Sequence, residues 1–231
     1  PMVGATALAT ARITSLDADG FTLGTNTAVN ASGGTYYWEA FNASAGTMVA
    51  GTYTGDGNAS QSITGVGFQP EYIIVLPATA VRAVQRSVDM TLTHVFDNNN
   101  AGVTTGVTAF GADGFTVGTT INASATVYHY IAFNAVAGKT STGTYTGDGL
   151  DNRSITGIGF QPEYVIAKAN AATAGAHRSA SQTGDDTMNF SATANFANGI
   201  QALEADGFQA GTSTQTNASS TAYYWIAFSG P

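Results

Sequence analysis

The sequence lacks cysteine, is poor in charged residues and contains no long hydrophobic segment. Without cysteine the chain can form no disulfide, no thiolate metal site and no cysteine nucleophile. Charged residues make up 10% of the chain, compared with roughly 25% in an average soluble domain. No apolar segment approaches the ~18 residues that a membrane-spanning helix needs. We therefore expect no membrane insertion and a surface built from Thr, Ser, Asn, Gln and Gly.

The few charges are mainly negative, with a formal net charge of −8 and only seven lysines and arginines. Nucleic-acid binding requires clustered cations that neutralise phosphates, so we expect no nucleic-acid partner. A surface of small polar residues is typical of extracellular fibres, adhesins and virion parts. The composition therefore predicts an extracellular, cell-surface or virion location.

Two long motifs of the sequence recur at a constant interval. The segment Gly51-Thr-Tyr-Thr-Gly-Asp-Gly57 returns at 143–149, 92 residues later. The segment Ile63-Thr-Gly-Val-Gly-Phe-Gln-Pro-Glu-Tyr72 returns at 155–164, after the same interval, with one Val→Ile change. Self-similarity at a fixed period is the signature of a repeat architecture.

A second set of motifs occurs three times, always in the same order. The set comprises Ala-Asp-Gly-Phe, then Asn-Ala-Ser, then an aromatic segment that ends in Ala-Phe. Its copies begin at Ala18, Asn30 and Tyr36, at Ala112, Asn122 and Tyr128, and at Ala205, Asn217 and Tyr223. The sequence therefore predicts a partial module, the back half, at 1–50 with an N-terminal extension, and two full modules at 51–142 and 143–231.

The modules have the pattern of β structure. The segments 72–76 and 164–167 are short, apolar and rich in β-branched residues, and a proline precedes each. No segment keeps a helical period over three turns, and Thr79–Met90 is only a weak helix candidate. The predicted fold class is all-β, with tandem β-sandwich (jelly-roll-like) modules, and the pattern does not distinguish a sandwich from a jelly-roll.

The repeated Asp-Gly-Phe motif predicts a tight turn before a strand. Aspartate caps or tolerates such turns, glycine adopts positive φ, and phenylalanine begins the next strand. The same argument favours a turn over a Ca²⁺ loop for Asp56 and Asp148, each of which lies in Gly-Asp-Gly.

The order of these motifs resembles a repeat found in tail and appendage proteins of bacteriophages and in uncharacterised prokaryotic surface proteins. The motifs are Gly-Phe-Gln-Pro-Glu-Tyr at 67–72, Arg-Ser at 86–87, Asp-Gly-Phe, Asn-Ala-Ser and Tyr-Tyr-Trp-Ile-Ala-Phe at 223–228. The resemblance covers nearly the whole chain from residue 12, although His129 and Tyr130 depart from it. It implies a β-sandwich with a structural role on a virion or cell surface, and it carries no catalytic or binding residues.

The sequence shows no constellation for catalysis or for a cofactor. The three histidines lie at non-equivalent module positions without metal-ligand spacing. Neither a Gly-x-Ser-x-Gly motif nor a P-loop occurs. We therefore expect no enzyme activity, no metal and no cofactor.

Several residues are candidates for ligand binding. Aromatic rings at one repeat position and the recurring arginines could contact a glycan, although core packing of the rings and a Glu71–Arg86 type of ion pair are favoured. These glycan-stacking candidates are Trp38, Tyr130, Trp225, Arg86 and Arg178. The Asn-Ala-Ser motifs make Asn30, Asn122 and Asn217 candidates for N-glycosylation.

Glu39 occupies the position that Ile131 and Ile226 hold in the full modules. A carboxylate in an apolar sandwich interior is costly unless it is paired. The partial module is thus expected to pack differently or to stay open, with Glu39 at a self-association site. Unpaired strand edges invite pairing with another chain.

These observations favour a non-enzymatic structural building block of an extracellular fibre or virion appendage. It would self-associate, as a homo-oligomer or filament, through the strand edges of its incomplete N-terminal module. The alternative is a carbohydrate-binding or host-adhesion module with glycans as partners. A hydrolase is the least favoured, because paired carboxylates are not evident at matching positions.

Overall fold

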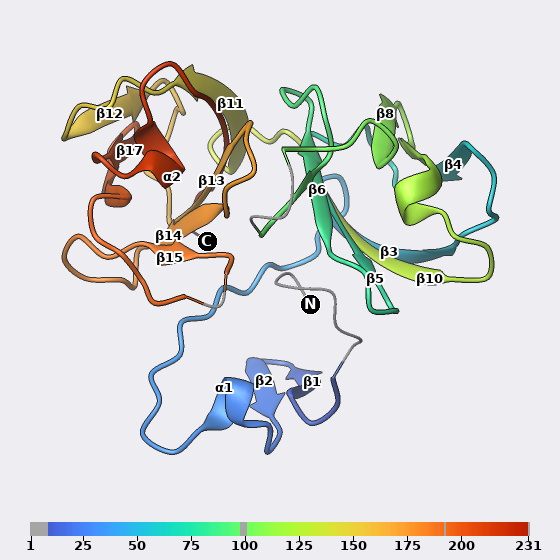
Figure 1. Cartoon of the computed structure of the whole chain (residues 1–231). Helices are drawn as coiled ribbons and strands as arrows, with labels where there is room; N and C mark the ends of the chain where they lie inside the picture. The colour runs from blue at the N-terminus through green and yellow to red at the C-terminus, as the bar shows by residue number, and fades with distance from the viewer. Residues whose placement is uncertain (1–8, 98–100, 192, 231) are drawn as a thin grey trace.

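The computed structural model describes residues 9–97, 101–191 and 193–230, and it is all-β with two β-sandwich modules. Figure 1 shows these two modules side by side and a small N-terminal lobe below them. The predicted fold class is confirmed. The expected N-terminal extension, residues 1–8, lies outside the described residues.

The first complete module packs a five-stranded sheet on a three-stranded sheet. The larger sheet has the order β3-β10-β5-β6-β7 and the smaller one the order β4-β9-β8, with antiparallel neighbours throughout. Its elements are β3 (Met48–Thr54), β4 (Gln61–Thr64), β5 (Tyr72–Pro77), β6 (Val84–Ser87), β7 (His94–Val95), β8 (Val107–Gly111), β9 (Gly114–Val117), the 3₁₀ helix η1 (Thr119–Ile121) and β10 (Val127–Phe133).

The second complete module repeats this topology. Its sheets have the orders β11-β18-β13-β14-β15 and β12-β17-β16. Its elements are β11 (Thr140–Thr146), β12 (Arg153–Thr156), β13 (Tyr164–Ala169), β14 (Ala176–Ser179), β15 (Met188–Asn189), β16 (Ile200–Glu204), β17 (Gly207–Ala210), α2 (Thr214–Asn217) and β18 (Ala222–Phe228).

Among the described residues, the N-terminal lobe contains only the elements of a module's second part. These are β1 (Ile13–Asp17), β2 (Gly20–Leu23) and α1 (Thr27–Asn30), followed by the segment 36–41, which forms no strand. We call β3–β7 or β11–β15 a front half, and β8–β10 or β16–β18 a back half. Residues 9–41, which match a back half, are the N-terminal half module.

The central strands of the larger sheets have two apolar faces. In β5, Ile73 and Val75 point into the core of the first complete module. Tyr72 and Ile74 point the other way and join a cluster shared by both modules. Burial on both faces explains why this strand is a continuous apolar run rather than an alternating pattern.

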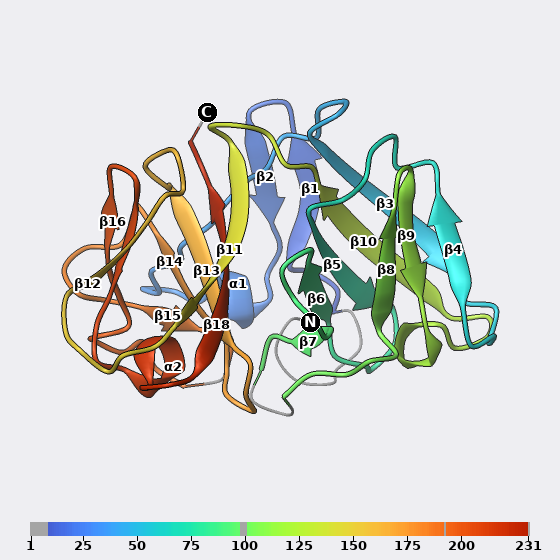
Figure 2. The ribbon, with the colours of Figure 1, turned by 90° about the horizontal axis from the view of Figure 1, so that it is seen from above.

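The outer faces of the two five-stranded sheets meet in the middle of the molecule. Figure 2 shows the larger sheets on the inner sides of the two modules, with β1 and β2 behind the gap between them. The buried members of this shared cluster are Tyr72, Ala83, Phe96, Phe133, Ile166, Phe190, Ile226 and Phe228. Burial of these side chains joins the two modules into one body.

Two details differ from the sequence prediction. The segment Thr79–Met90 contains strand β6 and no helix, because its residues pair with β5 and supply core side chains such as Val84. The first strands of the modules begin at Met48 and Thr140, slightly before the expected boundaries at 51 and 143. The predicted strands at 72–76 and 164–167 are confirmed as β5 and β13.

The Asp-Gly-Phe motifs form the predicted turns, between β8 and β9 and between β16 and β17. Gly114 has φ of +145°, and a Cβ atom there would lie 2.0 Å from the carbonyl oxygen of Ile63 in β4. Both the dihedral angle and the close approach of β4 therefore require glycine at this position.

Candidate functional site

The N-terminal half module has the same internal geometry as the two complete back halves. Its hairpin has the same register and the same bulge, with Ile13 opposite Leu23 as Val107 is opposite Val117. The Tyr36 hydroxyl accepts from the backbone N–H of Ala31, at 2.8 Å. Equivalent bonds hold the other two copies, to Tyr128 at 3.0 Å and Tyr223 at 2.8 Å.

An aromatic pair inside each back half is preserved as well. The equivalent rings meet edge to face in all three copies. Their centroids are 5.5, 5.2 and 6.3 Å apart in Phe21–Trp38, Phe115–Tyr130 and Phe208–Trp225. The half module therefore has the local fold of a back half, although its front half is absent among residues 9–97, 101–191 and 193–230.

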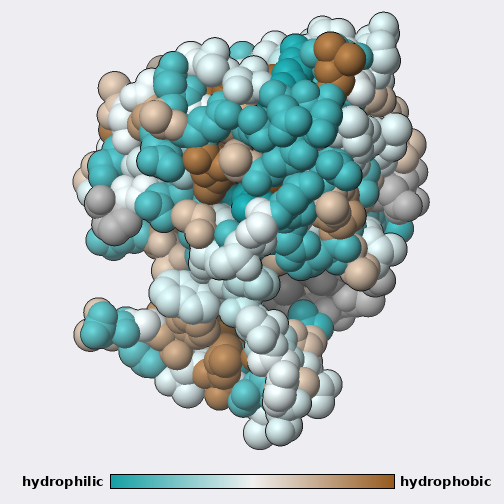
Figure 3. Space-filling model, turned by 90° about the vertical axis from the view of Figure 1, so that its left-hand side faces the viewer, coloured by the Kyte–Doolittle hydropathy of each residue, from teal (hydrophilic) through white to brown (hydrophobic). Residues whose placement is uncertain are grey.

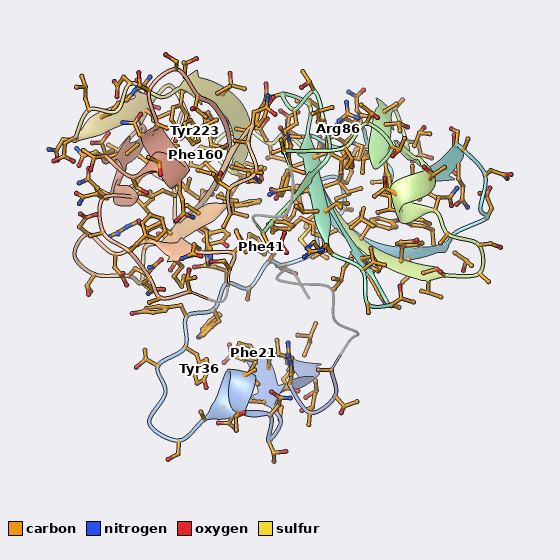
Figure 4. All side chains as sticks on the ribbon, viewed as in Figure 1. Phe21, Tyr36, Phe41, Arg86, Phe160 and Tyr223 are labelled. Carbon is orange, nitrogen blue, oxygen red and sulfur yellow. The ribbon has the colours of Figure 1, made fainter. Side chains whose placement is uncertain are left out.

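The consequence is an exposed apolar surface where the complete modules have a core. Trp38 is 63% exposed, whereas Tyr130 and Trp225 are 8% and 6% exposed. Ile13 is 57% exposed, whereas its equivalents Val107 and Ile200 are almost fully buried. Figure 3 shows hydrophobic side chains gathered on the lower lobe, and Figure 4 shows Phe21 and Tyr36 there.

The backbone of the segment 36–41 is open on both sides. In the first module the equivalent strand, β10, pairs with β3 on one side and β5 on the other. Among the described residues no strand pairs with 36–41 or with the free side of β2. We call this surface, made of Ile13, Leu23, Tyr36, Trp38 and the backbone of 36–41, the open face.

Asn30 marks a polar position next to the open face. In the complete modules the equivalent asparagines, Asn122 and Asn217, hold the Gly-Asp-Gly turn of the front half. The Asn122 side chain accepts from the backbone N–H of Asp56 at 3.0 Å and donates to the Asp56 carboxylate at 2.7 Å. Asn30 instead donates to the carbonyl of Gly24 at 2.9 Å, so it has no turn to hold.

The Asp of the Asp-Gly-Phe motif is a second such position. Asp113 accepts from the backbone N–H groups of Gly65 and Gly67 at 3.0 and 2.6 Å, and these bonds lower its pKa. Asp206 binds the second module's front half in the same way. The equivalent residue of the half module, Asp19, has no hydrogen-bond partner among the described residues.

Next to the open face lies a cavity of about 550 Å³ between the two complete modules and the N-terminal lobe. Its lining is mainly apolar and includes Trp38 and Phe41 of the half module and Ile74 of the first module. The carboxyl group of Glu39 lies against Ser179 at its edge. Partial desolvation there raises the pKa of Glu39, and the charge of Glu163 adds to this rise. Glu39 thus lies at the junction and not inside a sandwich core.

The candidate glycan-binding residues are separated by the fold. The rings of Tyr130 and Trp225 lie in the module cores, which is the packing role that the sequence favoured, and no sugar can stack on them without opening the sandwich. Trp38 keeps an accessible ring, so glycan stacking stays a prediction there.

The two candidate arginines bind backbone carbonyls. Arg86 (Figure 4) donates to the carbonyls of Met90 and Val107, and Arg178 donates to those of Gly184, Asp186 and Ile200. The expected ion pair between Glu71 and Arg86 is therefore wrong, since the described residues contain no such contact. Backbone carbonyls of loops and of the first residues of β8 and β16 bind these guanidinium groups instead.

The three candidate glycosylation sites differ in accessibility. Asn122 and Asn217 are buried and their amide groups are engaged with the front halves, so a glycan there is incompatible with the folded modules. Asn30 is exposed, and its modification remains a prediction.

Within the described residues no group of three or more His, Asp or Glu side chains could hold a metal ion. Asp56 and Asp148 form turns in which each carboxylate accepts from the backbone N–H two residues later. The helices in the described part of the chain are all too short to cross a membrane.

No protein-family model matches the chain, and no curated protein or solved structure is significantly similar to it. The sequence predicted an incomplete module with Glu39 at its association site, and it gave Asp19 as a turn residue only, not as a binding group. The sequence did contain a signal for this role. The Asp-Gly-Phe aspartate occurs three times, whereas the Gly-x-Gly segment that binds it occurs only at 65–67 and 157–159, so Asp19 is left without a counterpart.

Proposed function

We propose that this protein is a non-enzymatic structural building block of an extracellular fibre or virion appendage, and that it assembles through the open face. The observation that carries the proposal is the contrast between Trp38 and its two buried equivalents. A surface folded like the interior of a sandwich is expected to be covered in the assembled state.

Two physical terms favour such assembly. Burial of a large apolar side chain contributes about 1.5–3 kcal/mol, and the open face exposes Ile13, Tyr36 and Trp38 together. The backbone of 36–41 also offers unpaired N–H and C=O groups to an added strand, which is the basis of β-augmentation. A low-charge polar surface over the remainder of the chain suits packing in a fibre.

Self-association of the chain follows from the same surface. Two open faces that contact each other form a closed, isologous pair, whereas an open face that contacts a different surface extends a filament. Both arrangements bury Trp38. The proposal therefore predicts that the chain associates and that association depends on the open face.

Sedimentation velocity over a range of concentrations tests this prediction. The variant Trp38→Lys places a charge on the open face, and Leu150→Lys is a matched control because Leu150 is 66% exposed on the second complete module. We expect Trp38→Lys to weaken association at least tenfold and Leu150→Lys to leave it unchanged. A monomeric wild-type chain at high concentration, or equal effects of both variants, contradicts the proposal.

A carbohydrate-binding role remains the second candidate because Trp38 presents an accessible ring. A glycan array separates the two functions. Saturable binding that is lost in Trp38→Ala, without any effect of that variant on association, favours the glycan role.

A further inference from the structure

Three equivalent phenylalanines, one from each back half, meet at the centre of the molecule. They are Phe41, Phe133 and Phe228, the last residues of the three Ala-Phe motifs. Their ring centroids are 5.3 Å apart for Phe41–Phe133, 4.8 Å for Phe41–Phe228 and 4.8 Å for Phe133–Phe228. Figure 4 shows Phe41 between the two complete modules. The three units are thus arranged around a common point, as in a pseudo-threefold assembly.

The tyrosines around this point give the arrangement a direction. Phe41 of the half module contacts Tyr164 of the second module, at 6.4 Å, and Phe228 of that module contacts Tyr72 of the first module, at 6.5 Å. The third contact of the cycle would join Phe133 to the equivalent tyrosine of the N-terminal unit. That tyrosine belongs to a front half, and the N-terminal unit has none among the described residues.

All strands that the N-terminal unit lacks correspond to one continuous segment. In the first module the matching strands, β3, β4, β5, β6 and β7, lie within residues 48–95 without interruption. A single front half would therefore pair with both sides of 36–41 and with the free side of β2. It would also place its outer face against Ile74 and Ile131, which line the junction cavity.

We propose that the open face is the docking site for a front half of this same repeat that comes from outside residues 1–231. The occupant is defined by its chemistry: it has the Gly-Thr-Tyr-Thr-Gly-Asp-Gly turn, the Gly-x-Gly turn and an apolar strand like β5. Docking completes a third sandwich and closes the ring of three modules. The assignment rests on the proposed function and names the partner of its open face.

The residue types needed to hold this occupant are present at the equivalent positions. Asp19 is free to accept from the Gly-x-Gly turn as Asp113 does. Asn30 would exchange its bond to the carbonyl of Gly24 for the Gly-Asp-Gly turn that Asn122 binds. Tyr36 is positioned to stack on the tyrosine of the Gly-Thr-Tyr-Thr motif. The corresponding rings are stacked in both complete modules, at 5.0 Å in Tyr53–Tyr128 and 5.1 Å in Tyr145–Tyr223.

The space for the missing strand is also free. A Cβ atom on Gly114 or Gly207 would clash with the carbonyl oxygen of β4 or β12, at 2.0 and 1.9 Å. A Cβ atom built on Gly20, the equivalent position, would meet no atom within 4 Å beyond its chain neighbours. The half module therefore has the glycine that the close approach of a front-half strand requires, and no described residue occupies that space.

A second copy of residues 1–231 cannot supply this occupant without loss. The described part of each copy has three back halves and two front halves, and both front halves are paired within their own modules. A copy that donated one would open another of its own modules. The occupant must therefore be a front half that has no back half of its own, and pairing between two open faces is the weaker contact of the isolated chain.

Co-expression with a separate tagged segment of residues 46–97 tests the assignment. A Trp225→Phe background leaves Trp38 as the single tryptophan, so its fluorescence reports the open face. We expect the segment to copurify one to one with the chain. We also expect the Trp38 emission to shift to shorter wavelength and its quenching by acrylamide to fall several-fold.

Substitution of Asp19 provides a specific control. Asp19→Ala removes the group that accepts from the Gly-x-Gly turn, and it breaks no hydrogen bond of the described residues. We expect at least a tenfold loss of affinity for the segment. Asn42→Ala, which alters an exposed asparagine beyond the open face, is expected to leave the affinity unchanged.

A fused arrangement covers the case in which the free segment does not stay soluble. A copy of residues 46–97 placed directly before residue 1 leaves residues 1–12 as the connection to β1, in place of 98–106 in the first module. Protection of Trp38 in this fusion supports the assignment. If Trp38 stays as exposed as in the parent chain both with the free segment and in the fusion, the assignment is wrong.

The two proposals fail in different ways. If the chain self-associates through Trp38 but Trp38 stays exposed in the fusion, assembly through the open face is supported. In that case the front half is rejected as the occupant. A protected Trp38 in the fusion together with a parent chain that stays monomeric supports the occupant and rejects self-association.

Discussion

At the residue scale, three equivalent aspartates have the same turn but not the same contacts. Asp113 and Asp206 accept from the backbone of a Gly-x-Gly turn and thereby join a back half to a front half. Asp19 occupies the same turn of the half module without such a contact among the described residues. The Asp-Gly-Phe motif is the same in all three copies. The difference therefore arises from whether a front half lies beside the aspartate.

This comparison gives a prediction for stability. Asp113→Ala removes two charge-assisted hydrogen bonds to exposed backbone N–H groups, which join the back half to the front half, so we expect the midpoint of thermal unfolding to fall by a few degrees. Asp19→Ala is expected to leave the midpoint unchanged. Differential scanning calorimetry of the two variants measures both, and an equal loss in each would show that the turn itself, and not its contact, requires aspartate.

The sequence predicted the role of a residue correctly where the backbone conformation determines that role. Gly114 and its equivalents had to be turn glycines because their φ is positive, and the Asp-Gly-Phe pattern indicated this. It was less reliable for Arg86, whose partners Met90 and Val107 are backbone carbonyls. Carbonyl groups leave no trace in the amino-acid types, so the sequence suggested Glu71 instead.

At the scale of elements, the Ala-Phe strands show what pairing contributes. The segments Val127–Phe133 and Ala222–Phe228 are central strands with neighbours on both sides. The segment 36–41 matches them in sequence, but within the described residues no strand pairs with it and it forms no strand itself. Sequence similarity therefore identifies the equivalent segments but does not indicate which of them is paired as a strand.

The phenylalanines at the ends of these segments allow a direct comparison. Phe228 is buried, and truncation of a buried Phe to Ala commonly costs about 3–5 kcal/mol. Phe41 is 39% exposed, so Phe41→Ala should cost less than half as much. Urea denaturation of the two variants tests this order. A larger loss for Phe41→Ala would mean that the half module stabilises the whole junction.

The helix candidate Thr79–Met90 shows the limit of local patterns. Its residues have mixed propensity, and only pairing with β5 decides that Val84–Ser87 is a strand. The apolar run at β5 likewise indicated that both faces of the strand are buried. It did not indicate that the second face packs on another module.

At the scale of the whole molecule, the junction between the complete modules contains buried ionisable groups. His94 lies beside the ring of Tyr224, at 5.5 Å between centroids, and the positive charge of Lys168 acts on it. Burial is the main cause that lowers the pKa of His94 to about 4, with the Lys168 charge as the smaller cause. The fold therefore keeps this side chain neutral.

In the unfolded chain His94 takes up a proton below about pH 6.5, whereas in the folded chain it stays neutral down to about pH 4. Stability is full above pH 6.5 and falls as the pH approaches 4, by up to about 3 kcal/mol for this group. His94→Met, which copies the equivalent Met188, should flatten this dependence.

Chemical denaturation at a series of pH values checks the prediction. The exposed His129 supplies a control, since His129→Gln should leave the dependence as it is in the parent chain. His177, whose pKa burial also lowers to about 4, contributes in the same pH range. If His94→Met keeps the full loss of stability between pH 6.5 and 4, then His177 and other groups, and not His94, govern the acid response.

The central claim is that one of three equivalent units is open. Hydrogen–deuterium exchange of the parent chain, at a dilution at which it is monomeric, tests it most directly. The backbone N–H groups of 36–41 should exchange quickly, and those of 128–133 and 223–228 should be protected by their pairing on both sides. Equal protection of all three segments would show that the N-terminal unit is already complete, and the account would be wrong.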